Sequence, residues 1–244
     1  PYSIWWLLIQ KDWYYYQGDM NYLKLQKEYI TGLLKLLISK IDDKGRERLK
    51  EGRFLDWPSS ENPEAIDAGL QALMLMGMKA GEDLCSILGD NELAQECKNK
   101  ADMLAKVANE VIAPFARSKK KPTDPGMKQA AAMLSLAGLM NPQEAEQKYL
   151  SVDGAHGFST FYGYYMLRAM AKAGNYQGAL DQIRSFWGGM LDMGATSFWE
   201  DFNLDWMENA GRIDELVPNG KKDIHGDYGN YCYQGFRHSL CHGW

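Results

Sequence analysis

Apolar residues recur every three to four positions along most of the chain, up to about residue 192. In 66–88 the positions Ile66, Leu70 and Leu73 fall on one stripe, together with small residues. This spacing is the period of an amphipathic α-helix. Because small residues allow a neighbour to come close, we expect this helix to pack tightly against another one.

Glycines, prolines and capping residues divide the helical sequence into segments. Gly89 is expected to stop one helix and Asp90 to cap the next. Asp124-Pro125 and Asn141-Pro142 each place a capping residue before a proline at the first helical position. The pattern predicts helices over 2–16, 19–41, 66–88, 91–113, 126–140, 158–173 and 176–192, and one that starts at Asn141. No strand-like alternation competes with them, so we predict an all-α chain of helical hairpins.

Helical hairpins in series can close into a toroid, with the inner helices facing a central cavity. An open solenoid or an irregular bundle fits the same helices. From residue 194 onward the period is lost, and glycine, aromatic residues and histidine become frequent. Long irregular segments in a compact domain tend to be functional, so we expect site residues there.

Composition excludes some classes of partner. The chain has 244 residues, of which 45% are hydrophobic, and a formal net charge of −5. Its one basic run, 119–121, lies in a proline-flanked loop, where a solvated segment is expected, so nucleic acid is not a predicted partner. No apolar run approaches the roughly 20 residues that span a bilayer, so no membrane span is predicted.

Neither the cysteines nor the histidines form a recognisable metal site. The chain has four cysteines, Cys85, Cys97, Cys232 and Cys241. We expect buried free thiols, and the sequence does not decide whether Cys232 and Cys241 form a disulfide. A metal held by His238 and His242 would need further ligands, and the sequence has no His-Glu-x-x-His pattern or clustered cysteines. We therefore predict no metal and no cofactor.

The segment 194–202 has the most informative chemistry. It places Glu200 directly after Trp199, with small and aromatic residues on either side. A carboxylate held against a large aromatic ring is a common arrangement in sugar-hydrolysing sites, where the carboxyl group acts as acid, base or nucleophile. An ordinary exposed loop glutamate is the alternative, but the flanking residues argue against a freely solvated side chain.

Two further segments are candidates for the same cavity. Asp56-Trp57 repeats the pairing of carboxylate and indole, although an aspartate that caps a turn and a tryptophan that fills the core would look the same. Segment 156–162 opens a helix with aromatic residues and hydroxyls, which fits either a cavity wall or ordinary caps and core. No phosphate-binding loop and no Gly-x-Ser-x-Gly motif is found, so carboxylates with aromatic residues point to glycoside chemistry.

Together these stretches resemble a known family, the α-L-rhamnosidases of glycoside hydrolase family 78. Five segments, spread over the chain in the expected order, show the likeness: 1–6 with 14–19, 54–58, 158–165, 194–200 and 239–244. The family belongs to the six-hairpin glycosidases, with an (α/α)6 barrel. The resemblance therefore implies most of an (α/α)6 toroid and a carbohydrate substrate that contains terminal α-L-rhamnose.

The resemblance also implies roles for individual residues. The family inverts the anomeric centre, with one carboxylic acid protonating the leaving oxygen and one carboxylate activating water. Its general base lies in a Trp-Glu motif that maps onto Glu200. The expected substrate contacts, with the apolar wall suiting the 6-methyl group of rhamnose, are Asp56, Trp57, Phe161, Tyr162, Trp199 and His242.

The chain also departs from the family pattern. The family's general acid lies in a segment that ends in Trp-x-Gly-Asp, which is expected upstream of Pro1; Gln17-Gly18-Asp19 is a different, later motif. The helix expected to close the barrel would follow Trp244. We therefore expect 1–244 to be a single, partial catalytic domain truncated at both ends, with little or no hydrolytic activity.

Two alternatives remain. One is a six-hairpin glycosidase with another sugar specificity, since the residues themselves do not select rhamnose. The other is a non-catalytic helical toroid that binds a glycan or a partner protein. For localisation, export is favoured over the cytoplasm because enzymes that act on plant glycosides are often exported.

Overall fold

A computed structural model describes residues 2–50 and 52–223. These residues form ten α-helices with short 3-10 and π segments and no β-strand, so the all-α prediction is confirmed for them. Their contacts gather in two compact units, which we describe separately. Unit 1 is the described part of 1–55 and 63–119, and unit 2 that of 56–62 and 120–244. A single domain over 1–244 stays a prediction.

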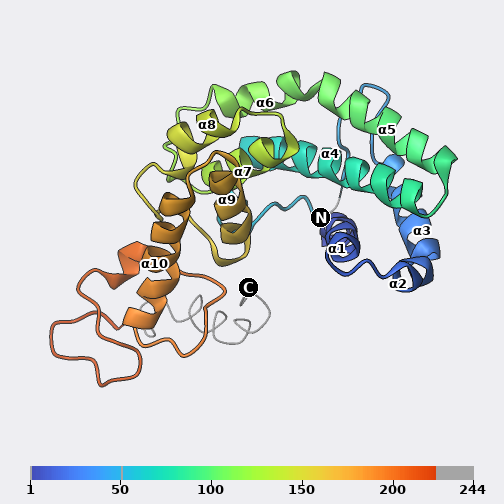
Figure 1. The fold of residues 1–244 in the computed structure, drawn as a ribbon. Helices are drawn as coiled ribbons and strands as arrows, with labels where there is room; N and C mark the ends of the chain where they lie inside the picture. The colour runs from blue at the N-terminus through green and yellow to red at the C-terminus, as the bar shows by residue number, and fades with distance from the viewer. Residues whose placement is uncertain (1, 51, 224–244) are drawn as a thin grey trace. The chain divides into compact units, whose positions relative to one another are not determined.

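Unit 1 is built around one long helix. It contains α1 (Tyr2–Gln17), α2 (Met20–Leu25), α3 (Lys27–Ile38), α4 (Pro63–Ile87), α5 (Asn91–Lys106) and α6 (Ala108–Ala116). Helix α4 contacts α1, α3, α5 and α6, and α5 runs beside it in Figure 1. A Cβ atom added to Gly77 would lie 2.6 Å from Ile4, and one on Gly81 would lie 2.5 Å from Leu34. The small residues on the stripe therefore do admit close neighbours, as predicted.

Two predicted helices of unit 1 are each divided. The helix expected over 19–41 turns at Gln26, between α2 and α3, and the one expected over 91–113 turns at Val107, between α5 and α6. The apolar period continues across both turns, so periodicity alone does not reveal them. Cys85 and Cys97 are buried free thiols, as predicted.

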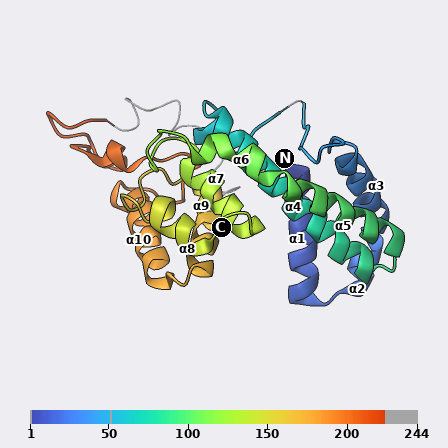
Figure 2. The ribbon, with the colours of Figure 1, turned by 90° about the horizontal axis from the view of Figure 1, so that it is seen from above.

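Unit 2 holds the segments that were singled out for their chemistry. Its elements are η1 (Trp57–Ser59), α7 (Met127–Ala137), α8 (Pro142–Ala145), η2 (Glu146–Leu150), α9 (Thr160–Lys172), α10 (Tyr176–Asp192) and η3 (Leu204–Met207). Helix α9 packs against α7 and α10, and the three lie close together in Figure 2. The approach of α9 to α10 depends on a glycine, Gly163. A Cβ atom at this position would lie only 2.5 Å from the ring of Trp187.

The helix ends of unit 2 follow the sequence signals, with one exception. Asn141 caps α8, since its Oδ1 accepts hydrogen bonds from the backbone N–H groups of Gln143 and Glu144. The prediction that Asp124 caps the next helix is wrong. Helix α7 begins after Gly126, whose φ is +85°, and Asp124 instead accepts a 2.8 Å hydrogen bond from the backbone of Lys121. The aspartate thus closes the preceding turn, three positions before Met127, the first residue of the helix.

Helix α10 ends where the sequence indicates. Gly194 follows it with a φ of +92°, a left-handed conformation that favours glycine. The backbone N–H groups of Gly194 and Ala195 donate back to the carbonyls of Leu191 and Met190. Beyond this cap, the described chain is irregular apart from η3, as predicted. No helix within 2–50 or 52–223 is both long enough and apolar enough to cross a membrane.

Candidate functional site

A cavity of about 1070 Å³ lies within unit 2. Its described walls come from η1, α10 and η3 and from the loops around 123–125, 153–158 and 200–203. Five aromatic side chains contribute to the described lining: Trp57, Phe158, Phe186, Phe202 and Trp206. A concave site of this size that combines aromatic and polar side chains is typical of small-molecule binding sites.

The cavity is acidic. The carboxylates in its described lining are Asp124, Asp153, Glu200, Asp201 and Asp205, and that lining includes no lysine or arginine. Burial raises the pKa of Asp201, and the neighbouring Glu200 carboxylate raises it further. A lining of this charge disfavours anionic ligands.

Trp57 and Glu200 meet at this cavity. The indole Nε1–H of Trp57 donates a 3.3 Å hydrogen bond to Oε1 of Glu200, across 143 positions of sequence. Trp57 is 61% exposed, so it does not fill the core. Glu200 is half-buried. The two alternative interpretations, an exposed loop glutamate at 200 and a tryptophan at 57 that fills the core, are therefore not found.

Asp56 lies beneath Trp57 and is only 2% exposed. Its Oδ1 accepts a 3.0 Å hydrogen bond from the backbone N–H of Trp57, which caps η1. Its Oδ2 accepts from the hydroxyl of Ser159 and, at 3.5 Å, from Nε2 of Gln129 on α7. Burial raises the pKa of Asp56 to about 6, while the hydrogen bond from Ser159 acts in the opposite direction.

The segment that carries Glu200 is held from the start of α9. Thr160 Oγ1 donates a 2.6 Å hydrogen bond to the carbonyl oxygen of Trp199. The indole of Trp199 is fully buried and packs edge to face against Phe202, with ring centroids 5.5 Å apart. Core packing of Trp199 thus anchors the backbone from which Glu200 extends.

Comparison with known proteins adds a likeness of fold. The fold is similar to that of a GH78 family rhamnosidase from Bacillus sp. GL1. The match has a TM-score of 0.64 and 22% sequence identity over 82% of this chain. The chain spans only 22% of the length of that protein. No family model and no curated protein matches the sequence.

The structure brings together only some of the site residues that the sequence predicts. Trp57 and Glu200 line the cavity, whereas Asp56 and Trp199 lie behind its wall. Phe161 is half-buried on α9 and is not part of the described lining. The others stay predictions: Tyr162 is fully buried, and His242 lies outside the described residues.

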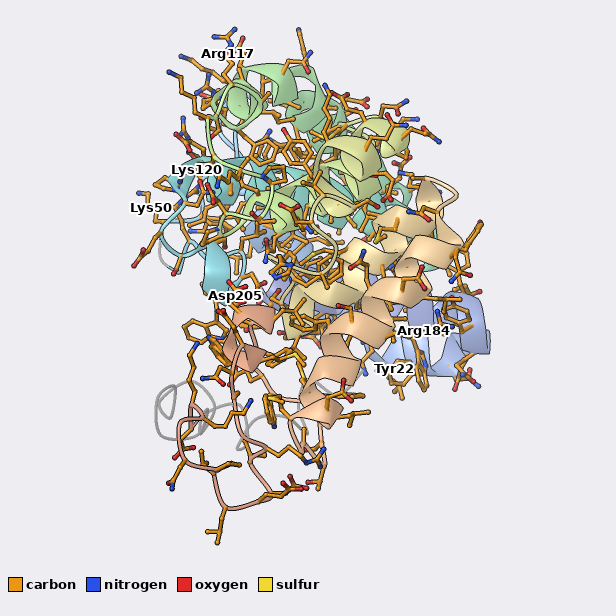
Figure 3. All side chains as sticks on the ribbon, turned by 90° about the vertical axis from the view of Figure 1, so that its left-hand side faces the viewer. Tyr22, Lys50, Arg117, Lys120, Arg184 and Asp205 are labelled. Carbon is orange, nitrogen blue, oxygen red and sulfur yellow. The ribbon has the colours of Figure 1, made fainter. Side chains whose placement is uncertain are left out.

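The sequence analysis missed Gln129, and it singled out His156 only as part of segment 156–162, of which 156–158 do line the cavity. Gln129 is fully buried and reaches both Asp56 and, at 3.4 Å, Ser159. His156 Nε2 lies 3.3 Å from Oδ1 of Asp205, which Figure 3 labels on η3. The only signal for Gln129 was a polar residue within the apolar sequence of α7. Nothing in the sequence indicated that His156 and Asp205 lie together.

Lys128, the neighbour of Gln129, supports the cavity wall from inside. Its Nζ donates hydrogen bonds to the carbonyls of Val152 at 2.8 Å and Gly154 at 2.5 Å, and it lies over the ring of Phe158. Burial lowers the pKa of Lys128 to about 8. This lysine therefore stabilises loop 151–158 and does not bind a ligand in the cavity.

Within the described residues, no three His, Cys, Asp or Glu side chains are grouped to hold a metal ion.

Proposed function

We propose that this chain forms part of an inverting glycoside hydrolase that removes terminal α-L-rhamnose, with Glu200 as the general base. The observation that carries the proposal is the hydrogen bond from Trp57 to Glu200 at an acidic, aromatic cavity. The likeness of fold to a GH78 rhamnosidase supports it.

The proposed chemistry follows from this geometry. The indole N–H of Trp57 holds one oxygen of the Glu200 carboxylate, which fixes the direction of the side chain. The carboxylate takes a proton from a water molecule as the water attacks the anomeric carbon. In an inverting enzyme the second carboxyl group lies roughly 6.5–9.5 Å away and protonates the leaving oxygen. Our expectation that this acid precedes Pro1 stays a prediction.

The charge of the cavity limits the class of sugar that we propose as substrate. Five carboxylates and no lysine or arginine in the described lining disfavour uronic acids and sulfated sugars, which need a cation. Aromatic faces suit the C–H surfaces of neutral pyranoses. A deoxy sugar with a methyl group, such as rhamnose, gains most from such walls.

The proposal is tested by comparing the natural gene product with its Glu200→Gln variant. Hydrolysis of p-nitrophenyl α-L-rhamnoside should fall by roughly 10²–10⁴-fold, the range that general-base catalysis contributes. The thermal unfolding midpoint and the affinity for L-rhamnose should change little. The first sugar released by the unmodified protein should be the inverted anomer by proton NMR. Unchanged turnover in Glu200→Gln would exclude Glu200 as the base.

A neutral sugar other than rhamnose is the second candidate, because flat aromatic rings accept many pyranoses. A panel of neutral aryl glycosides, with a glucuronide as the negative control, decides between the two. A cavity that binds a sugar while the natural gene product hydrolyses none of the panel would indicate the non-catalytic alternative.

A further inference from the structure

Two consecutive hydroxyls at the start of α9 hold two distant segments. Ser159 Oγ donates to Oδ2 of Asp56, which is 103 positions away in the sequence. Thr160 Oγ1 donates a 2.6 Å hydrogen bond to the carbonyl of Trp199, 39 positions away. All four of these residues are buried. Adjacent positions of one helix start therefore bind two segments that the sequence keeps far apart.

Each of the two acceptors directly precedes a residue that lines the cavity. Asp56 precedes Trp57, whose backbone N–H it also binds, and Trp199 precedes Glu200. The hydrogen bond from Trp57 to Glu200 joins the two segments at the cavity. The contacts thus close a ring that starts and ends at the peptide bond between the two hydroxyl residues.

We infer that Ser159 and Thr160 are positioning residues, which together set the distance and direction between the Trp57 indole and the Glu200 carboxylate. The meaning of this role for catalysis rests on the proposed function. The geometric role does not, since it concerns only the hydrogen bond between the two side chains.

Ser159 gives up an ordinary function to make this contact. It occupies the position before the first residue of α9, where a serine side chain usually accepts a hydrogen bond from a backbone N–H of the first turn. In this helix the side chain makes no such bond. Its hydroxyl is directed to the Asp56 carboxylate, and Gln129 approaches the same hydroxyl at 3.4 Å.

The two hydroxyls lie at the start of a well-packed helix. Helix α9 packs against both α7 and α10, and Gly163 allows the ring of Trp187 to lie against its backbone. Because α9 is packed on two sides, we expect its two hydroxyls to serve as a common reference position for the two loops. Hydrogen bonds from adjacent residues cannot shift independently, which is why the pair sets a relative position.

The inference is tested by NMR on the chain labelled with ¹⁵N-tryptophan. Eight indole signals are expected, and the Trp57 signal is identified by its loss in Trp57→Phe. Ser159→Ala and Thr160→Val should each move it towards its position in Glu200→Ala. Thr160→Ser, which restores the hydroxyl, should leave it in place. Ser39→Ala and Thr31→Val are the matched controls on unit 1, and neither should move it.

The outcomes separate this inference from a general loss of stability. The other seven indole signals report whether a variant is folded, and if Thr160→Val is not folded, Thr160→Ala takes its place. A folded Ser159→Ala and a folded hydroxyl-free variant at 160 that both leave the Trp57 signal unchanged would overturn the inference. So would a shift in Thr160→Ser equal to that in the hydroxyl-free variant.

A kinetic measurement separates the inference from the proposed function. In the natural gene product, Thr160→Val should lower kcat for the rhamnoside by about tenfold or more with little change in KM, because misplacement of a catalytic group costs rate before it costs binding. If the unmodified protein hydrolyses no glycoside while the indole signal still shifts, the proposed function fails and the positioning role stands. An unchanged kcat beside a shifted indole signal would remove the catalytic part of the inference.

Discussion

The indole Nε1–H of Trp57 donates a 3.3 Å hydrogen bond to Oε1 of Glu200, and both side chains line one acidic cavity. The donor sits on a short 3-10 helix capped by a buried aspartate, and the acceptor extends from a loop anchored by a buried tryptophan. A carboxylate that is held by an oriented donor keeps one direction, which a general base needs for efficient proton transfer.

Trp57→Phe should separate the roles of the ring and the N–H group. Phenylalanine keeps an aromatic face in the cavity but cannot donate to Glu200. Hydrogen bonds to charged groups contribute about 1.5–3 kcal/mol, so we expect a fall of roughly 10–100-fold in kcat/KM for the rhamnoside. Steady-state kinetics of the natural gene product measure it. Trp13→Phe, at a half-exposed indole of α1, is the control and should leave kcat/KM unchanged.

Asp56→Asn should change how stability depends on pH. Burial raises the pKa of Asp56 to about 6, from an ordinary value of 3.8. Between these two values the folded state therefore holds a proton that the unfolded state has released. The stability that this proton gives is fully present below about pH 3.8 and is lost as the pH rises through about 6. Between about pH 4 and about pH 7 the free energy of unfolding should fall relative to Asp56→Asn by on the order of 3 kcal/mol.

Urea unfolding of both proteins across this range measures the difference. Gln129→Leu supplies a second check, because the hydrogen bond from Gln129 lowers the pKa of Asp56. Its loss should move the pH at which stability declines upward. A difference between the wild type and Asp56→Asn that does not vary with pH would show that Asp56 titrates alike in the folded and unfolded states.

The helices could be predicted from the sequence because apolar residues recur at helical spacing, as in the buried stripe of α4. Single-residue turns such as Gln26 could not, since the stripe continues across them. At the site, Glu200 and Trp57 were predictable because their residue types indicate their chemistry. Segment 156–162 was a candidate as well, but the partners of Ser159 and Thr160 were not predictable, because a hydroxyl at a helix start predicts a cap and both hydroxyls instead make tertiary contacts.

Gly163→Ala should destabilise unit 2. A Cβ atom at this position would lie 2.5 Å from the Trp187 ring, so α9 and α10 would have to move apart or the indole would have to change rotamer. Overpacking of this kind costs about 1–3 kcal/mol. Thermal unfolding followed by circular dichroism measures the loss.

Gly188→Ala on α10 is the matched control. A Cβ atom there meets nothing within 4 Å, and alanine favours a helix over glycine by roughly 0.5–1 kcal/mol. The two substitutions should therefore change stability in opposite directions. Equal effects would mean that α9 and α10 do not pack as closely as described.

Lys128→Met should reveal the buried lysine by its pH dependence at the alkaline end. Burial lowers the pKa of Lys128 to about 8, from an ordinary value of 10.5. Between these two values the unfolded state holds a proton that the folded state has lost, so stability rises with pH. From about pH 8 to about pH 10.5 the wild type should gain on the order of 3 kcal/mol relative to Lys128→Met. Urea unfolding at several pH values measures this gain. Lys24→Met, at an exposed position of α2, is the control, and its free energy of unfolding should follow the same pH dependence as that of the wild type. If Lys128→Met also follows the wild type, the Lys128 ammonium is solvated.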